Sequence, residues 1–301
     1  MEEIKNKLHN ILIYLGQYSY QYDEVARKVI EISKPDRTKI SALIRDSSNI
    51  FFVIGRGEKE DWATLLSFFG LRYGKEFIDE ILAEYILRRD KELVVMYGNC
   101  QLHDYFDCLN MSFDFNEKYY SIYFKYQEYS RWKEDKFEFA LKMCSLLICT
   151  NEKFDSRYRN CREYVGKYNK GSFVINIPTY CYRGYFPQTN PFIQEKGEFD
   201  IVNEIFNSFH REDKIINNMI LRGYDIESII RQINSGSTIA KEDIFRCNKI
   251  SLMQIEAMDR ISDIKIYDFF KKNYQHIRLF KDPVHMENCL VWYVAMKILK
   301  L

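Results

Sequence analysis

The feature that most constrains the fold is a regular alternation of short apolar runs and helical patterns from residue 91 onward. The runs are Leu93–Tyr97, Tyr119–Tyr126, Leu146–Thr150 and Ser172–Ile177, with His276–Phe280 as a candidate fifth. Runs of this length are typical of buried strands, and strands separated by helices imply βαβ units with right-handed crossovers. Residues 91–301 are therefore predicted to form a flavodoxin-like three-layer α/β domain with a central parallel sheet.

Residues 1–90 are predicted to be a mainly helical N-terminal extension. Apolar residues recur there at helical spacing in Ile4, Leu8, Ile11, Leu12 and Leu15, in Val25, Val29 and Ile32, and again from Phe77 to Ile86. One strand-like run, Ile50–Ile54, lies between them and leads into Gly55-Arg56-Gly57. A strand that enters Gly-x-Gly can present backbone amides to a phosphate, but a structural turn is the simpler interpretation.

Two helical segments are expected in the C-terminal half. Residues 203–272 are largely polar with apolar stripes at helical spacing, so they are predicted to be a helical insertion in the α/β domain. Asn234-Ser235-Gly236-Ser237 marks a turn within it. Val291–Leu301 is predicted to close the chain as a helix.

Composition excludes several classes of protein. Lys and Arg number 44 against 43 Asp and Glu, so no global basic field exists for nucleic acid or anionic lipid. An apolar share of 47% indicates a globular chain, and no apolar run reaches the length of a membrane span. The N-terminus lacks the apolar core of a secretory signal. The eight cysteines contain no Cys-x-x-Cys pair, so we expect no metal site and mostly reduced thiols in a cytoplasmic protein.

The strongest candidate for chemistry is the turn after the first strand of the α/β region. Gly98-Asn99-Cys100-Gln101 ends that strand and starts a helix. A cysteine at a helix N-terminus is favoured in its thiolate form, which is the nucleophilic form. The amides of the same turn could stabilise an oxyanion. The alternative is a small residue that merely fits a tight turn.

A second element follows the last strand candidate. Asp282 and His285 are three residues apart on a turn, a spacing that lets the carboxylate fix the tautomer of the imidazole. His103 lies three residues after Cys100 and is a rival general base on the same helix face.

The β-prone, aromatic stretch from Tyr119 to Tyr126 is interpreted as a sheet strand rather than as a platform on which nucleic-acid bases stack.

Together these residues carry a resemblance. The sequence resembles the SGNH or GDSL-type hydrolase arrangement with cysteine in place of serine. In that arrangement a strand leads through Gly98-Asn99-Cys100 into a helix, and Asp282 and His285 follow near the end. The Gly-Asn-Cys-Gln element resembles the WcbI-type polysaccharide biosynthesis acetyltransferase family over about residues 91–301. Further matches are Ile177-Pro178, Gly184-Tyr185-Phe186-Pro187 and Arg278-Leu279-Phe280. Phe186 stands where the family commonly has His, and Met286 where it commonly has Pro.

The resemblance implies binding of coenzyme A and transfer of an acetyl group to a sugar hydroxyl in the synthesis of capsular or other surface polysaccharide. Cys100 would accept the acyl group or position the thioester, His285 would deprotonate the acceptor, and Asp282 would orient His285. The residues implied at the oxyanion or substrate are Gly98, Asn99, Gln101, Asn151, Gly184 and Tyr185.

Coenzyme A carries phosphates and needs cationic donors. The densest basic stretch near a predicted strand end includes Arg157 and Arg159, and Arg183 follows the next strand. The resemblance favours Tyr158 and Arg159 as the residues that bind coenzyme A. The alternative is that these basic residues lie on a helix face exposed to solvent.

Two other functions stay open, namely a thiol-dependent hydrolase with water as acceptor and a non-catalytic carbohydrate- or nucleotide-binding module. A homo-oligomer is also compatible with the sequence.

Overall fold

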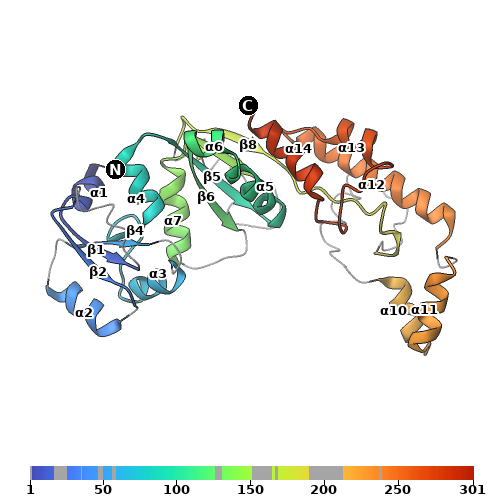
Figure 1. Ribbon diagram of the computed structural model, residues 1–301, viewed down its shortest axis with the longest axis horizontal. Coiled ribbons are helices and arrows are strands. Elements are labelled where there is room, and N and C mark those ends of the chain that lie inside the picture. Colours follow the sequence, from blue (N-terminus) through green and yellow to red (C-terminus); the bar gives the residue numbers. More distant parts are fainter. Residues whose placement is uncertain are drawn as a thin grey trace. The chain divides into compact units, whose positions relative to one another are not determined.

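The computed structural model describes residues 2–16, 26–34, 36–46, 50–55, 59–125, 131–150, 165–166, 169–189, 213–236 and 239–301 (Figure 1). The chain folds into two compact units. Unit 1 comprises Met1–Tyr97, Asn110–Ile148 and Asn160–Val174, and unit 2 comprises Gly98–Leu109, Cys149–Arg159 and Ile175–Leu301. The domain boundary expected near residue 90 stays a prediction.

Unit 1 begins with a four-stranded parallel sheet in the order β2-β1-β3-β4. Its strands are β1 (Ile11–Leu15), β2 (Lys28–Ile32), β3 (Ile50–Ile54) and β4 (Phe77–Asp79). The strand predicted at Ile50–Ile54 is confirmed as β3. The two central strands, β1 and β3, pair with Leu15 opposite Ile54.

The prediction of helix at Ile11–Leu15 and at Lys28–Ile32 is wrong, because both segments are strands of this sheet. The physical reason lies in the burial of consecutive side chains in β1, namely Leu12, Ile13, Tyr14 and Leu15. An amphipathic helix would turn one of these to solvent, whereas a parallel strand covered on both faces buries them all. The N-terminal segment is thus an α/β arrangement rather than a mainly helical extension.

Helices accompany this sheet: α1 (Glu2–Leu8), α2 (Arg37–Asp46), α3 (Lys59–Phe68) and α4 (Glu80–Arg88). The helical stripe predicted from Phe77 to Ile86 is strand at its start and helix afterwards. Asp79 marks the change, since its carboxylate accepts a hydrogen bond from the amide of Leu82 (3.2 Å) and caps α4.

The second sheet has the order β6-β5-β7-β8. Its strands, all confirmed from the sequence, are β5 (Glu92–Gly98), β6 (Tyr119–Lys125), β7 (Leu146–Cys149) and β8 (Phe173–Asn176). The amide of Phe173 bonds to Ser145 O, and that of Ile177 bonds to Cys149 O, so the partners advance together as in a parallel pair. A first strand flanked by the second and third is the order of flavodoxin-like sheets, and the predicted α/β class is confirmed.

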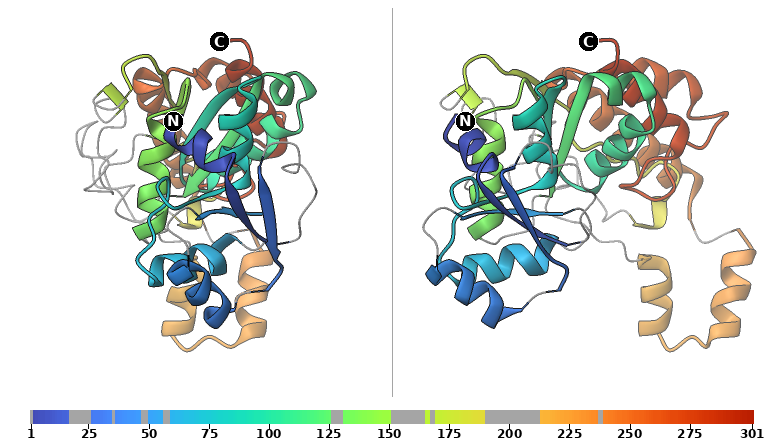
Figure 2. Two further views of the ribbon diagram at one scale, coloured as in Figure 1. Left: turned by 90° about the vertical axis from the view of Figure 1, so that its left-hand side faces the viewer. Right: turned by 60° about the vertical axis from the view of Figure 1, so that its left-hand side comes forward.

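The remaining helices lie between and after these strands: α5 (Cys100–Asn110), α6 (Phe113–Lys118), α7 (Arg131–Leu141), α10 (Lys214–Leu221), α11 (Ile226–Asn234), α12 (Lys241–Ile261), α13 (Tyr267–Asn273) and α14 (Asn288–Ile298), with a 3-10 turn η1 (Pro187–Thr189). Within its described part, the 203–272 insertion is helical as predicted, and α10 and α11 form a hairpin (Figure 2). The closing helix is confirmed as α14. Among the described residues, no helix combines the length and apolar character needed to cross a membrane.

The strand predicted at His276–Phe280 is wrong. The chain instead turns back on itself, with an isolated antiparallel bridge between Phe280 and Met286. The amide of Lys281 donates to the carbonyl oxygen of His285 (2.9 Å) and closes this loop. Leu279 and Phe280 are buried without being in a strand, which explains part of the strand-like pattern, whereas Ile277 is exposed.

Candidate active site

The turn between β5 and α5 is tight because Gly98 has no side chain. A Cβ at Gly98 would lie 2.7 Å from Leu102 Cδ2 and 2.8 Å from Thr150 Oγ1. Such distances are below van der Waals contact, so a larger residue at Gly98 would force the side chains of Leu102 and Thr150 to shift. Gly98 therefore acts through packing, which lets α5 start two residues later at Cys100.

Asn99 caps α5 with its side chain. Asn99 Oδ1 accepts hydrogen bonds from the amides of Gln101 (3.1 Å) and Leu102 (3.4 Å), while Nδ2 donates to Thr179 Oγ1 (2.7 Å). These bonds hold Cys100 as the first residue of an 11-residue helix, with its side chain exposed. The helix dipole at this position favours the ionised form of a thiol.

Gln101 connects the cysteine turn to two distant segments. Its side-chain Nε2 donates to Tyr180 O (2.6 Å) and Val284 O (2.5 Å), and its Oε1 accepts from the amide of Tyr180 (3.0 Å). The residue is 1% exposed, so these bonds form away from water. Because Gln101 follows Cys100 and Val284 precedes His285, the bond to Val284 brings the two turns together. Gln101 is thus a positioning residue rather than a substrate contact.

Asp282 and His285 form a hydrogen-bonded pair on the loop after α13. Asp282 Oδ2 lies 2.7 Å from His285 Nδ1, and Oδ1 accepts from the amides of Val284 and His285 (2.9 Å each). Burial raises the pKa of Asp282, but the bonds from Val284 and His285 outweigh it and leave the pKa below its usual value. An ionised Asp282 accepts a hydrogen bond from Nδ1–H, a tautomer that leaves His285 Nε2 as the basic atom. Among the described residues, no hydrogen bond engages Nε2.

Two further contacts fix the loop that carries His285. The amide of Tyr182 donates to Pro283 O (2.9 Å). Tyr105 on α5 donates its hydroxyl to the sulfur of the buried Met286 (3.2 Å). The methionine that departs from the family pattern therefore anchors the loop to the helix that begins at Cys100.

His103, the rival base, has a carboxylate partner of its own. Its Nδ1 lies 3.3 Å from Asp107 Oδ2, and both side chains are about half exposed. It stays on the α5 surface, whereas the Gln101 bond connects the His285 loop directly to the cysteine turn. His285 therefore lies on the loop that is joined to the cysteine turn, whereas His103 pairs with Asp107 within α5.

Asp104 is a site residue that sequence reasoning missed. It lies four residues after Cys100, on the same face of α5, and is half-buried. Burial raises its pKa, while the positive charges of Lys281 and, when protonated, His285 and His103 partly oppose that rise. In the sequence, only the i, i+4 spacing from Cys100 indicated Asp104. The spacing does not reveal that the loop Lys281–His285 lies near this helix.

The comparison with protein families shows which family this chain belongs to. The family model of the polysaccharide biosynthesis enzyme WcbI matches residues 93–301, which contain the Cys100 turn and the Asp282–His285 pair. The chain belongs to the WcbI family.

A solved structure agrees with this assignment at the level of the fold. It is that of WcbI, described as a polysaccharide biosynthesis enzyme, in a native form without a disulfide bond between coenzyme A and one of its cysteines. The TM-score is 0.57 at 14% identity, over 70% of this chain and 69% of that one. No curated protein matches this chain.

Two predicted WcbI-family site residues have structural roles. A Cβ at Gly184 would lie 2.4 Å from Tyr182 Cζ, so Gly184 permits the close approach of that ring.

Arg183 is 4% exposed, and burial lowers the pKa of its guanidinium. Its amide donates to Ser251 Oγ (3.1 Å). A guanidinium in the interior is poorly placed for a phosphate that arrives from solvent.

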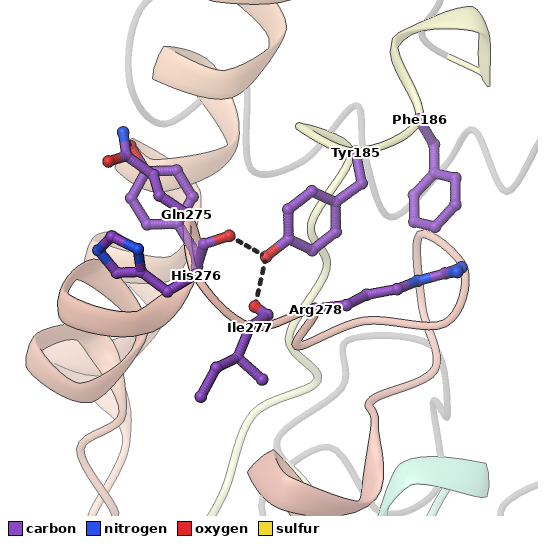
Figure 3. A pocket seen from close by; sticks show the side chains of 7 residues that line it. Tyr185, Phe186, Gln275, His276, Ile277 and Arg278 are labelled. Carbon is purple, nitrogen blue, oxygen red and sulfur yellow. Dashed lines mark hydrogen bonds between the residues drawn. The ribbon is translucent and has the colours of Figure 1, made fainter.

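Tyr185 lines a pocket of about 400 Å³ (Figure 3). The other lining residues are Phe186, Tyr274, Gln275, His276, Ile277 and Arg278. The hydroxyl of Tyr185 donates to the carbonyl oxygens of Tyr274 (2.5 Å) and Ile277 (3.2 Å), so this hydroxyl is not directed at an oxyanion. The Arg278 guanidinium lies 5.5 Å from the centre of the Phe186 ring, a cation–π contact at the position where the family commonly has His.

Several predicted residues lie outside the described ranges. They are Asn151, the oxyanion candidate, and Arg157, Tyr158 and Arg159, the coenzyme A candidates. Arg56 and Gly57 of the Gly-x-Gly element also lie outside, while Gly55 packs against the Tyr14 ring.

Proposed function

We propose that this chain transfers an acetyl group from coenzyme A to a hydroxyl of a sugar or glycan precursor in the biosynthesis of surface polysaccharide. The observation that carries the proposal is the Gln101 bond to Val284 (2.5 Å), which joins an exposed helix-terminal cysteine to a histidine oriented by a carboxylate. Membership of a family of polysaccharide biosynthesis enzymes supports the sugar acceptor. The coenzyme A named with the solved relative supports the thioester donor.

The proposed reaction needs a base and a site for a sulfur. His285 Nε2 takes the proton of the acceptor hydroxyl, and the hydroxyl oxygen attacks the thioester carbonyl. When the tetrahedral adduct collapses, the carbon–sulfur bond breaks and the coenzyme A sulfur leaves with the proton from His285. In a two-step version, Cys100 first displaces coenzyme A as its thiol, and the acceptor oxygen then displaces Cys100.

The negative charge on the adduct needs donors at the cysteine turn. We assign that role to the backbone amides of Asn99 and Cys100, together with Asn151. The phosphates of coenzyme A are assigned to Arg157, Tyr158 and Arg159. Arg183 is left out of this set because it is buried.

The five buried cysteines among those described, free of disulfides, suit a reducing compartment such as the cytoplasm.

A thiol-dependent hydrolase is the second candidate. Cys100 is exposed and His285 is about a quarter exposed, so water could reach the same atoms and serve as acceptor. The two functions share every residue of the site and differ in what the acyl group is transferred to.

The test begins with the purified chain and coenzyme A. Differential scanning fluorimetry with millimolar coenzyme A is expected to raise the melting temperature, because binding stabilises the folded state. Intact-mass measurement after incubation with acetyl-CoA distinguishes an acetylated Cys100 from direct transfer. Cys100→Ser and His285→Ala should each lower consumption of acetyl-CoA by at least about a hundredfold. No thermal shift, or unchanged turnover in both variants, would contradict the proposal.

A further inference from the structure

The carboxylate of Asp104 has an unusual environment beside the proposed site. Cys100 and Asp104 are four residues apart on α5, so their side chains point to the same side of the helix. Tyr105, the next residue, bonds to Met286 on the loop that carries His285. Asp104 is thus on the helix turn that packs against this loop.

Asp104 differs from Asp282 and Asp259, two other aspartates of unit 2, in its hydrogen bonds. Asp282 accepts three, and the buried Asp259 accepts bonds from the Tyr180 hydroxyl and the amides of Ile266 and Tyr267. Within the described ranges, Asp104 accepts no hydrogen bond and has no ion pair within 4.0 Å, although it is half-buried. A partly desolvated carboxylate without donors is unfavourable, so a donor from a bound molecule would stabilise it.

The charges around Asp104 indicate the kind of donor. The charges of Lys281, and of His285 and His103 when protonated, lower the pKa of Asp104, and the charge of Asp107 raises it. A cationic ligand group would be repelled by Lys281, and by either histidine when it is protonated. A neutral hydroxyl would not, and a charge-assisted O–H bond to a carboxylate is stronger than a neutral one.

We propose that Asp104 binds a second hydroxyl of the acceptor, adjacent to the hydroxyl that receives the acyl group. This inference rests on the proposed function. His285 Nε2 takes the proton of the reacting hydroxyl, while Asp104, on the Cys100 helix, holds its neighbour. The site then selects acceptors that carry two neighbouring hydroxyls, as sugars do, over simple alcohols.

The test compares two small acceptors, propane-1,2-diol and propan-1-ol, with acetyl-CoA as donor and ester formation as readout. Wild type is expected to prefer the diol by about tenfold or more, the value of one hydrogen bond to a charged group. Asp104→Ala and Asp104→Asn should reduce that preference to below about threefold, through a loss of transfer to the diol. Asp107→Asn, the same change one turn away, should keep the preference.

The outcomes separate this inference from the proposed function. Turnover without a diol preference in wild type, or a preference that survives Asp104→Ala, overturns the role of Asp104 alone. An equal loss of transfer to both acceptors in the Asp104 variants also overturns it, since that would indicate a structural role. No consumption of acetyl-CoA by wild type overturns both proposals.

Discussion

The side-chain amide of Gln101 donates a 2.5 Å hydrogen bond to the backbone carbonyl of Val284, across 183 positions of sequence. Each residue is the neighbour of a proposed catalytic group, Cys100 in one case and His285 in the other. The bond is buried, so water cannot replace it easily when it is lost. It joins the cysteine turn to the loop that carries His285.

Gln101→Glu tests this connection with a side chain of the same shape. A carboxylate has no N–H to donate, and its oxygens would face the carbonyls of Tyr180 and Val284. We expect a loss of unfolding free energy on the order of 3 kcal/mol, because buried acceptors are left unsatisfied. Urea denaturation measures it. Gln232→Glu, on the exposed face of α11, should change stability by less than about 0.5 kcal/mol. Equal effects of the two changes would refute the argument.

Asp282→Asn tests the orientation of His285 and carries a pH signature. The pKa of Asp282 is lowered in the folded protein, so its ionised form adds stability above the unfolded pKa, and this is lost as pH falls through the folded value. The variant should melt below wild type at neutral pH, with the gap closing in acid. Turnover of acetyl-CoA should drop at least about tenfold, since Nδ1 loses its anionic partner. A gap that widens as pH falls would contradict this account.

Asp104→Asn should have the opposite effect on stability. Burial raises the pKa of Asp104, so the carboxyl destabilises the folded protein once pH rises above its unfolded pKa. The variant is expected to melt above wild type at neutral pH and to match it in acid. Thermal melts at several pH values check this without an acceptor. If the variant were less stable at neutral pH, Asp104 would have a stabilising partner instead.

Gly98→Ala tests the strand-to-helix turn. The new Cβ would meet Leu102 and Thr150 at less than 3 Å, and we expect a loss of about 1–3 kcal/mol together with weaker binding of coenzyme A. Gly171→Ala is the matched control, because its nearest contact is Asn169 Oδ1 at 3.7 Å. Denaturation and thermal shift with coenzyme A give both readouts. Equal tolerance at both glycines would show that the turn has room to adapt.

Tyr185→Phe tests whether this residue serves the substrate through its hydroxyl. The hydroxyl bonds to Tyr274 O and Ile277 O within the fold, so its removal should lower stability by about 0.5–1.5 kcal/mol. Turnover of acetyl-CoA should stay within about twofold of wild type, since no transition-state contact is removed. A large loss of turnover with unchanged stability would return Tyr185 to the catalytic site.

Prediction from sequence succeeded where the signal is local. The strands β3, β5, β6, β7 and β8 are short apolar runs, and the turn at Gly98 and Asn99 follows from a glycine and a capping side chain. It failed at Ile11–Leu15, where a run of apolar residues fits a helix stripe and a buried strand equally well. It failed again at His276–Phe280, since burial in a loop produces the same apolar pattern as a strand.

The sequence by itself determined the α/β class, the cysteine at a helix start and the pairing of Asp282 with His285, because each depends on residues a few positions apart. Only the tertiary structure decided that Gln101 joins the two turns, that Arg183 is buried and that the helix turn of Asp104 packs against the His285 loop. These depend on packing between segments far apart in the chain. Burial and long-range hydrogen bonds are properties of the folded protein, and no local pattern encodes them.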